Sequence, residues 1–262
     1  MTHKARKRFG QNFLQDHNII SNILSYIQLS NEQHWVEIGP GMGALTGPLL
    51  QENVKLDVIE LDRDLVRYLS DRFGQHQNLT IHSADALNFD FSTLATDEKK
   101  LRIIGNLPYN ISTPLMFHLL ESFDCIEDMH FMLQKEVVDR ICAEPGSKRY
   151  GRLSIMMQYY CETEFLFEVP PESFSPPPKV MSAIVRLAPH PQAPVEVNDI
   201  KQFNELVTQA FSQRRKTIRN SLSKLLSAEQ IAAIGIDPSQ RAETISLAEF
   251  AELSNAVTEN KR

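Results

Sequence analysis

Short apolar runs rich in β-branched residues alternate with stretches of helical spacing from about residue 18 to residue 135, and this alternation restricts the fold more than any other feature of the chain. The apolar runs that we expect to form strands are 35–38, 55–60, 79–82, 101–105 and 128–134. The helical stretches are 19–29, 44–51, 64–73, 113–120 and a segment after the fifth strand that ends at 143. Strands and helices in this order predict an α/β fold, a mostly parallel sheet with helices on both faces.

The pattern changes in the second half of the chain. A helix is expected at 153–161, a strand at 164–169, and a last strand at 180–187 that pairs antiparallel with its neighbour. Three prolines between Pro189 and Pro194 are typical of a linker, and only helical patterns follow them. We therefore predict two domains, a large α/β domain over 1–190 and a small all-helical domain over 191–262.

Three glycines, Gly39, Gly41 and Gly43, stand at the turn between the first strand and the next helix. Glycine lets a backbone approach a ligand closely, and the start of a helix offers free N–H groups. The spacing is not that of the dinucleotide fingerprint, and no Lys-Ser/Thr pair follows as in a P-loop. The turn therefore favours a ligand with an amino-acid tail and an adenosine over one with a pyrophosphate.

Polar side chains follow the next three strands in turn. Glu60 ends the second strand, where a carboxylate can accept hydrogen bonds from ribose hydroxyls. Asp85 follows the third strand and could accept from an adenine amino group, and Asn106 closes the fourth strand. Because open α/β sheets bind ligands at the carboxyl ends of their strands, we expect these residues and the glycine turn to form one site. A solvated or capping role is the alternative for either acid.

The turn Asn106-Leu107-Pro108-Tyr109 suits the methylation of a planar amino group. The Asn106 side-chain oxygen can accept one amino N–H, and the Leu107 or Pro108 carbonyl can accept the other. Tyr109 can stack on the base, and Phe174 could form a second plate. An ordinary strand-ending turn is the alternative for the motif, and a core position beside the prolines is the alternative for Phe174.

The net charge is −6, which argues against a nucleic-acid partner, but the basic residues are clustered. Those that we expect to hold phosphates are Arg6, Lys7, Arg8, Arg149, Arg214, Arg215, Lys216 and Arg219. Separated basic clusters on an acidic chain suggest a positive face for a polyanion, with solvated surface charge as the alternative. We expect Arg215 and Arg219 on one face of a single helix whose apolar face uses Ile218, Leu222 and Leu225.

The cysteines Cys125, Cys142 and Cys161 are far apart and lack metal-ligand spacing, which is typical of free thiols in a reducing compartment. We expect no metal site. No apolar run approaches the length of a membrane span, and no signal-peptide core follows the basic first residues. A cytoplasmic protein without a membrane partner is expected, and a monomer, since nothing suggests a helical dimer seam.

Four segments together resemble the ribosomal RNA adenine dimethyltransferases, a family of class I S-adenosylmethionine-dependent methyltransferases with a Rossmann-like sheet. These segments are Ala5–Leu14, Gly105–Ser112, Phe174–Val180 and Asn204–Asn220. The resemblance covers nearly the whole chain. It implies S-adenosyl-L-methionine as the cofactor, a basic N-terminal lid on the methyltransferase domain, and an RNA-binding role for the helical domain.

The resemblance also implies individual roles. Asn12 and Leu14 would contact the cofactor from the lid, Gly39 and Gly41 its methionine part, Glu60 its ribose, Asp85 its adenine, and Asn106 would border the methyl donor. The implied substrate is a pair of adjacent adenosines in the hairpin loop near the 3′ end of 16S rRNA, within the 30S subunit or its precursor, each dimethylated at N6.

Two other functions fit some of these features. A 23S rRNA adenine methyltransferase of the antibiotic-resistance type would share the cofactor site and the Asn-Leu-Pro-Tyr turn, although the proline loop and the basic segment at 214–219 favour the small-subunit enzyme. A ribosome-assembly factor that acts mainly by binding would use the basic clusters without catalysis.

Overall fold

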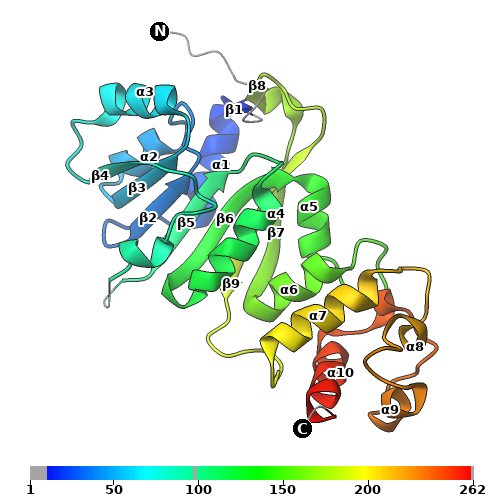
Figure 1. Ribbon diagram of the computed structural model, residues 1–262. Helices are drawn as coiled ribbons and strands as arrows, with labels where there is room; N and C mark the ends of the chain where they lie inside the picture. The colour runs from blue at the N-terminus through cyan, green and yellow to red at the C-terminus, as the bar shows by residue number, and fades with distance from the viewer. Residues whose placement is uncertain (1–10, 97–98, 261–262) are drawn as a thin grey trace. The chain divides into compact units, whose positions relative to one another are not determined.

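The computed structural model describes residues 11–96 and 99–260, which form two compact units (Figure 1). The first unit contains the chain up to Val138 together with Glu164–Pro189, and the second contains Asp139–Thr163 together with the chain from His190. The sequence-based division at 190 assigned 139–163 to the α/β domain. In the structure this segment groups with the C-terminal helices, because α6 (Arg152–Tyr160) packs against α7 (Ile200–Phe211) and α10 (Leu247–Glu259).

The first unit is built on a seven-stranded sheet with the order β4-β3-β2-β5-β6-β9-β7. Its strands are β2 (His34–Ile38), β3 (Lys55–Glu60), β4 (Leu79–Ser83), β5 (Leu101–Asn106), β6 (Ile126–Gln134), β7 (Cys161–Val169) and β9 (Ser182–Pro189). The strands from β4 to β6 pair in parallel, and β9 pairs antiparallel with β6. The predicted fold class is therefore confirmed, including its antiparallel final strand.

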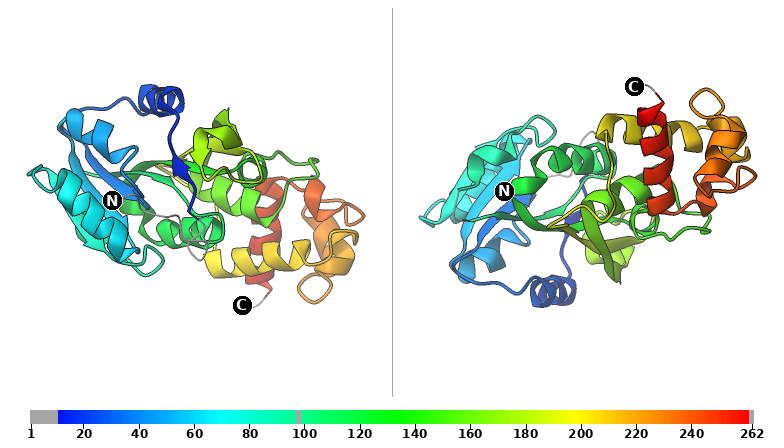
Figure 2. Two further views of the ribbon diagram at one scale, coloured as in Figure 1. Left: turned by 90° about the horizontal axis from the view of Figure 1, so that it is seen from above. Right: turned by 90° about the horizontal axis from the view of Figure 1, so that it is seen from below.

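Helices cover both faces of this sheet (Figure 2). They are α1 (His17–Ile27), α2 (Thr46–Gln51), α3 (Arg63–Phe73), α4 (Ser112–Leu119) and the start of α5 (Lys135–Ile141), with short 3₁₀ turns at Phe91–Leu94, Leu120–Cys125 and Pro171–Ser173. The helix α1 begins where the Asp16 side chain accepts hydrogen bonds from the Asn18 and Ile19 amides, at 2.9 and 3.4 Å. It buries Ile20, Ile23 and Ile27, which lie on one face by their spacing.

A second sheet of two short strands ties the N-terminal segment to the proline loop. Its strands are β1 (Phe13–Leu14) and β8 (Phe174–Ser175), which pair antiparallel with Leu14 opposite Phe174. The Gln15 amide also donates to the Ser173 carbonyl at 2.9 Å. These bonds fix the residues just before α1 against a segment 160 positions later in the chain.

The second unit is helical, as the pattern after the linker predicts. Besides α6, α7 and α10 it contains α8 (Ile218–Ser221), α9 (Ala228–Ala233) and a 3₁₀ turn at Ala242–Thr244. The expectation that Arg215 and Arg219 share one helix is wrong. The helix α7 ends at Phe211 and α8 starts only at Ile218, so Arg215 lies in the turn between them. Ile218 and Leu222 are buried as expected, but Leu226 rather than Leu225 fills the next core position.

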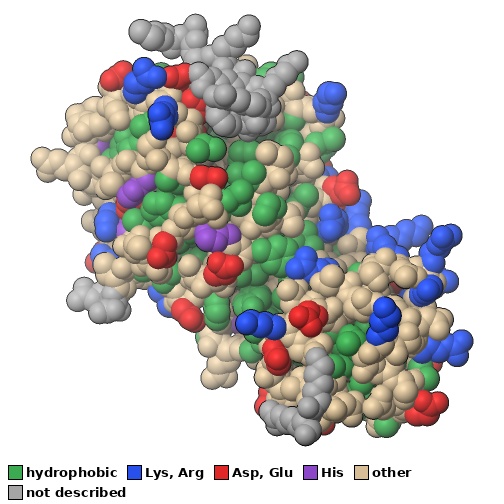
Figure 3. Space-filling model, in the orientation of Figure 1, with side chains coloured by type: hydrophobic (Ala, Val, Ile, Leu, Met, Phe, Trp, Pro, Cys, Tyr) green, Lys and Arg blue, Asp and Glu red, His purple; other side chains and the backbone are tan. Residues whose placement is uncertain are grey.

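Basic side chains gather along one side of this unit (Figure 3). Arg214 donates to the Lys148 and Tyr150 carbonyls, which joins the turn after α7 to the loop before α6. The Ile218 amide donates to the Gln240 carbonyl at 2.8 Å, which adds the segment before α10. Two separate pieces of sequence, 148–149 and 214–219, thus supply basic side chains to one surface, and the segment before α10 supports the second piece. No helix of the described residues has both the length and the apolar character that crossing a membrane requires.

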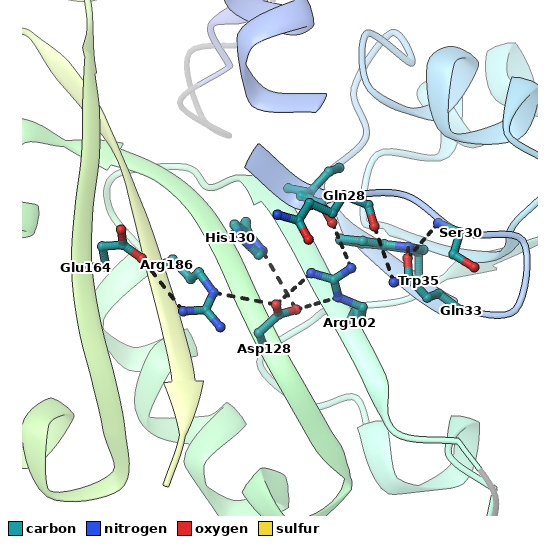
Figure 4. Close-up of polar contacts among 10 residues, drawn as sticks. Gln28, Ser30, Gln33, Trp35, Arg102, Asp128, His130, Glu164 and Arg186 are labelled. Carbon is teal, nitrogen blue, oxygen red and sulfur yellow. Dashed lines mark hydrogen bonds and ion pairs between the residues drawn. The ribbon is translucent and has the colours of Figure 1, made fainter. Parts of the chain in front are cut away.

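The first unit also buries a group of charged and aromatic side chains near the amino ends of its central strands (Figure 4). Arg102 of β5 donates to both carboxylate oxygens of Asp128 on β6, at 2.8 and 2.7 Å, and to the Ile27 carbonyl at 2.7 Å. The guanidinium lies 4.4 Å from the centre of the Trp35 ring. A buried pair of this kind is stable only when all its hydrogen bonds are made, which explains the carbonyl from α1.

His130 lies beside this pair, and none of the residues that the structure describes hydrogen-bonds either of its ring nitrogens. Burial lowers its pKa to about 4, and the positive charges of Arg102 and Arg186 act in the same direction while Asp128 opposes them. The unfolded chain, with an ordinary histidine pKa of about 6.5, binds more protons than the folded chain between pH 6.5 and 4. The free energy of unfolding therefore falls as the pH drops through this range.

The variant His130→Leu should lose this contribution. Between pH 7 and pH 4, the wild type should lose on the order of 3 kcal/mol more stability than the variant does. Urea denaturation at several pH values measures the difference. The same change at exposed His17 is the control, because that ring meets solvent in both states. Identical pH profiles for wild type and His130→Leu would contradict the assignment.

Candidate active site

A cavity of about 360 Å³ opens at the carboxyl ends of β2, β3, β4 and β5. The predicted residues that line it are Asn12, Leu14, Gly39, Gly41, Glu60, Asp85, Asn106, Leu107, Pro108 and Tyr109. The register explains why they meet: Ile38 pairs with Ile59, Glu60 pairs with Ser83, and Glu37 pairs with Ile104. Parallel strands in this alignment end at one edge of the sheet.

The glycine turn needs its glycines for two different reasons. Gly39, Gly41 and Gly43 all have positive φ angles, 66°, 57° and 81°, which other residues adopt only with strain. At Gly43 an added Cβ would also come within 2.5 Å of the Phe73 ring, so this glycine serves helix packing. At Gly39 its nearest neighbour would be the Asn106 carbonyl at 3.8 Å, so this glycine leaves open the space between the turn and β5.

Glu60 is 7 % exposed and accepts two backbone N–H groups, from Gly41 at 3.3 Å and from Asp62 at 2.9 Å. These bonds orient the carboxylate at the end of β3. Burial raises its pKa, while the backbone hydrogen bonds act in the opposite direction. A carboxylate has about four acceptor positions, so capacity for two further hydroxyl donors remains.

Asp85 sits in the loop after β4 and is half-buried. Its oxygens accept from the Leu87 amide at 3.0 Å and from the Asn88 side chain at 3.1 Å. Asp85 therefore has the capping role that was its alternative. A carboxylate has about four acceptor positions, so the same side chain can also accept a hydrogen bond from the cavity.

Asn106 is oriented by the lid segment. Its side-chain nitrogen donates to the backbone carbonyl of Asn12 at 2.9 Å. Because the amide nitrogen is committed to a carbonyl acceptor, the other end of the amide must be the oxygen, and none of the described residues donates to it. The geometry thus leaves an acceptor at the cavity.

The two carbonyls that follow differ. Pro108 already accepts from the Ile111 amide at 3.1 Å, which forms the turn before α4. Among the described residues none donates to the Leu107 carbonyl, although the Leu107 amide donates to Met132 at 3.2 Å. Of the two alternatives from the sequence, the structure therefore favours Leu107 as the second acceptor.

Tyr109 lines the cavity and is half-buried, and its hydroxyl lies 2.7 Å from the Ser182 hydroxyl. Burial raises its pKa, so the hydroxyl is neutral at pH 7. Phe174 is placed differently. It is 4 % exposed, packs in the core with Leu14 and Ile184, and does not line the cavity. The structure brings Tyr109 to the site and leaves Phe174 in the core position that was its alternative.

Two of the cavity residues that were not singled out from the sequence bear on its chemistry. Glu37 of β2 is fully buried and accepts from the Thr46 hydroxyl at 2.6 Å, and desolvation raises its pKa to about 7. Leu61 is 50 % exposed and lines the cavity directly after Glu60. The sequence carried a signal for each. Glu37 is an acid inside an apolar strand before the glycine turn, and Leu61 is an apolar residue between two acids.

The expected phosphate-binding residues are only partly described. Arg6, Lys7 and Arg8 lie outside the described residues. Arg149 pairs with Asp139 at 3.0 Å, and Arg214 is held by backbone carbonyls. Arg215, Lys216 and Arg219 are exposed on the second unit.

The donor set fits a cofactor with an amino-acid tail, a ribose and an adenine. The glycine turn offers backbone at close approach, Glu60 offers carboxylate oxygens, and the apolar side chains of Ile59 and Leu61 flank it. Among the described residues no group of histidine, cysteine and acidic side chains is arranged to hold a metal ion. The parallel sheet with its antiparallel strand and this site define a class I S-adenosylmethionine-dependent methyltransferase.

Comparison with known proteins gives the family. The sequence profile of the ribosomal RNA adenine dimethylases matches residues 2–259, so the chain belongs to that family. The ribosomal RNA small subunit methyltransferase A of Acinetobacter baylyi is 56 % identical over 97 % of this chain and 92 % of its own length.

Two solved structures are similar in fold. A dimethyladenosine transferase from Plasmodium falciparum superposes with a TM-score of 0.78 at 24 % identity, covering 95 % of this chain and 98 % of its own. The 23S rRNA methyltransferase ErmE superposes with a TM-score of 0.73 at 24 % identity, covering 94 % of this chain and all of its own. These likenesses confirm the methyltransferase fold.

The variant Gly39→Ala should weaken cofactor binding, because its Cβ would enter the space between the glycine turn and Asn106. We expect the Kd for S-adenosylmethionine to rise by about tenfold or more. Calorimetric titration measures it. Gly235→Ala is the matched control, since Gly235 has φ 82° with no atom within 4 Å of an added Cβ. An equal loss of affinity in both variants would show that backbone strain, not the cavity, is responsible.

Proposed function

We propose that this protein dimethylates N6 of two adjacent adenosines in the 3′-terminal hairpin loop of 16S rRNA, within the 30S subunit or its precursor. The observation that carries the proposal is a pair of acceptors, the Asn106 amide oxygen and the Leu107 carbonyl, to which none of the described residues donates and which lie on cavity residues beside Tyr109. Family membership and the high identity to a small-subunit methyltransferase support the choice of RNA.

S-adenosyl-L-methionine supplies an electrophilic methyl group when it is bound. The residues that would hold it are the glycine turn at its methionine part, Glu60 at its ribose, Asp85 with Ala86 and Leu61 around its adenine, and Asn12 and Leu14 from the lid. All of these residues except Gly43 of the turn line the cavity.

The chain's own contribution to the chemistry is to hold the adenine amino group. Its lone pair is delocalised into the ring, which makes the nitrogen a poor nucleophile. Acceptors at Asn106 and Leu107 would take the two N–H groups and favour a tetrahedral nitrogen, whose lone pair is free. This preference for the transition state over the planar ground state is the source of catalysis. The nitrogen would become cationic once it is methylated, and one of its N–H protons, acidic only from that point, would then pass to water, so no strong general base is needed.

The target base must leave its stack to reach the cavity, and Tyr109 would provide the plate on which it lies. The Phe174 side chain would form a second plate only after leaving its core position. A second methylation requires that the monomethylated base re-enter with its remaining N–H toward an acceptor, so the cavity must accommodate one methyl group.

We propose that the basic surface of the second unit, formed by Lys148, Arg149, Arg214, Arg215, Lys216 and Arg219, holds RNA phosphates, with Arg6, Lys7 and Arg8 adding contacts near the lid. Recognition of a hairpin mainly by its shape and backbone fits such a surface. We further propose that the protein works as a monomer in the cytoplasm, where free cysteines such as Cys125 and Cys161 stay reduced.

The direct test is mass spectrometry of rRNA nucleosides after incubation with labelled cofactor. Undermethylated 30S particles should yield labelled N6,N6-dimethyladenosine, and protein-free 23S rRNA should not. Label confined to 23S rRNA would establish the resistance-type activity instead, and the absence of label from adenine N6 in both would overturn the proposal.

The variant Asn106→Ala separates catalysis from binding. Loss of one transition-state acceptor should lower kcat by about 10²-fold or more while 30S binding persists. Methyl incorporation and particle pelleting measure the two. If the variant fully restores growth and 30S maturation in cells that lack the enzyme, binding is the main role. If it retains normal methylation, the acceptor assignment is wrong.

The variant Arg215→Ala/Lys216→Ala should weaken 30S binding and reduce the slope of log K against log salt by about 1.5, because two phosphate contacts are lost. Filter binding at salt concentrations from about 50 to 200 mM measures this slope. Lys201→Ala at the opposite end of α7 is the control. A slope unchanged from wild type would remove these side chains from the RNA surface.

A further inference from the structure

The hydroxyl of Tyr109 makes a hydrogen bond to a serine from a distant part of the chain. Its oxygen lies 2.7 Å from the Ser182 Oγ. Ser182 is fully buried, and among the described residues it is the one hydrogen-bond partner of this hydroxyl. The two residues stand 73 positions apart, so the bond is a tertiary one rather than a local turn.

The backbone of Ser182 is held from two sides. It is the first residue of β9 and pairs antiparallel with Gln134, the last residue of β6. The carbonyl of the preceding residue, Met181, accepts from the Lys135 amide at 2.9 Å. The serine oxygen therefore stands on the sheet itself, at the end of the proline loop, and its position is set by the strand register.

Among the described residues, the other hydrogen bond of Tyr109 holds its backbone and not its ring. The residue lies in the turn between β5 and α4, and its backbone carbonyl accepts from the Ser112 hydroxyl at 3.2 Å. That bond fixes the backbone but leaves rotation about the side-chain dihedral angles. The hydroxyl bond pins the far tip of the ring and so fixes the direction in which the ring points. Because a phenol O–H and its acceptor lone pair lie in the ring plane, a partner held at one position also favours one rotation of that plane about the ring axis.

We infer that Ser182 is a positioning residue for methyl transfer: through its hydroxyl it holds the Tyr109 ring in the plane on which the target adenine lies. Ser182 does not line the cavity and touches neither cofactor nor base, so its action passes through Tyr109 alone. The inference rests on the proposed function, in which Tyr109 is the plate for an adenine.

Positioning has a kinetic signature. A ring with several orientations still presents an apolar surface, so cofactor binding should be unaffected, but the amino group meets Asn106 and Leu107 less often in the reactive geometry. Ser182→Ala should therefore lower kcat by about tenfold with the Kd for S-adenosylmethionine unchanged. Tyr109→Phe should have a similar effect, since it removes the same bond from the other side.

The double variant Ser182→Ala/Tyr109→Phe tests the shared pathway. If both residues act through one bond, the double variant should be no slower than the worse single variant. Multiplied effects, or a fall in cofactor affinity and thermal stability that parallels kcat, would show a general structural role and overturn the inference. Ser254→Ala, which removes a buried serine hydroxyl in the second unit, is the control for burial alone.

A second readout reports the base itself. With 2-aminopurine at a target position of a hairpin RNA in complex with the full-length protein, stacking on Tyr109 should quench fluorescence. Ser182→Ala should restore part of the signal at saturating protein, and Ser254→Ala should not. If the wild type methylates adenine, and Ser182→Ala shows the same rate and the same quenching as the wild type, this inference is wrong and the proposed function stands. If the wild type does not methylate adenine, the proposed function itself is wrong.

Discussion

The parallel pairing of β2 with β3 on one side and β5 on the other is the constraint on which the site depends. It aligns Gly39, Glu60 and Asn106 at one edge, and a one-residue slip would turn each side chain to the opposite face. Gly105 is needed for this alignment, because a Cβ there would lie 2.6 Å from the Ile38 carbonyl. Because the two strands approach closely, the glycine turn lies near the turn that begins at Asn106.

The opposite ends of the same strands are held by a different kind of interaction. Arg102, Asp128 and Trp35 form a buried group that joins β2, β5 and β6 to the end of α1. His34 and His82 each lie 2.6 Å from an oxygen of Asp57, which links β2, β3 and β4 in the same way. Such pairs add little net stability but penalise every misaligned arrangement that would leave a buried charge alone. The register is thus specified by polar groups of which none lines the cavity.

Much of this could be predicted from the sequence, and the failures have physical reasons. The strands were predictable because buried parallel strands are continuous apolar runs, and the residues that line the cavity because they follow those runs. Phe174 could not be placed, since pairing of β1 with β8 is a tertiary event without local signature. The helix across Arg215 and Arg219 was wrong because helical spacing continues through a turn that only packing against the segment before α10 reveals. Residues 139–163 were misassigned for the same reason: their partners lie fifty residues later.

The hydrogen bond from Asn106 to Asn12 uses the main chain of the lid rather than a side chain. Every residue type has that carbonyl, so a substitution at position 12 changes the side chain at the cavity without removing the acceptor of the Asn106 amide. The side chain at position 12 and the orientation of the Asn106 amide can therefore change independently under selection. What selection must preserve at this point is the path of the backbone.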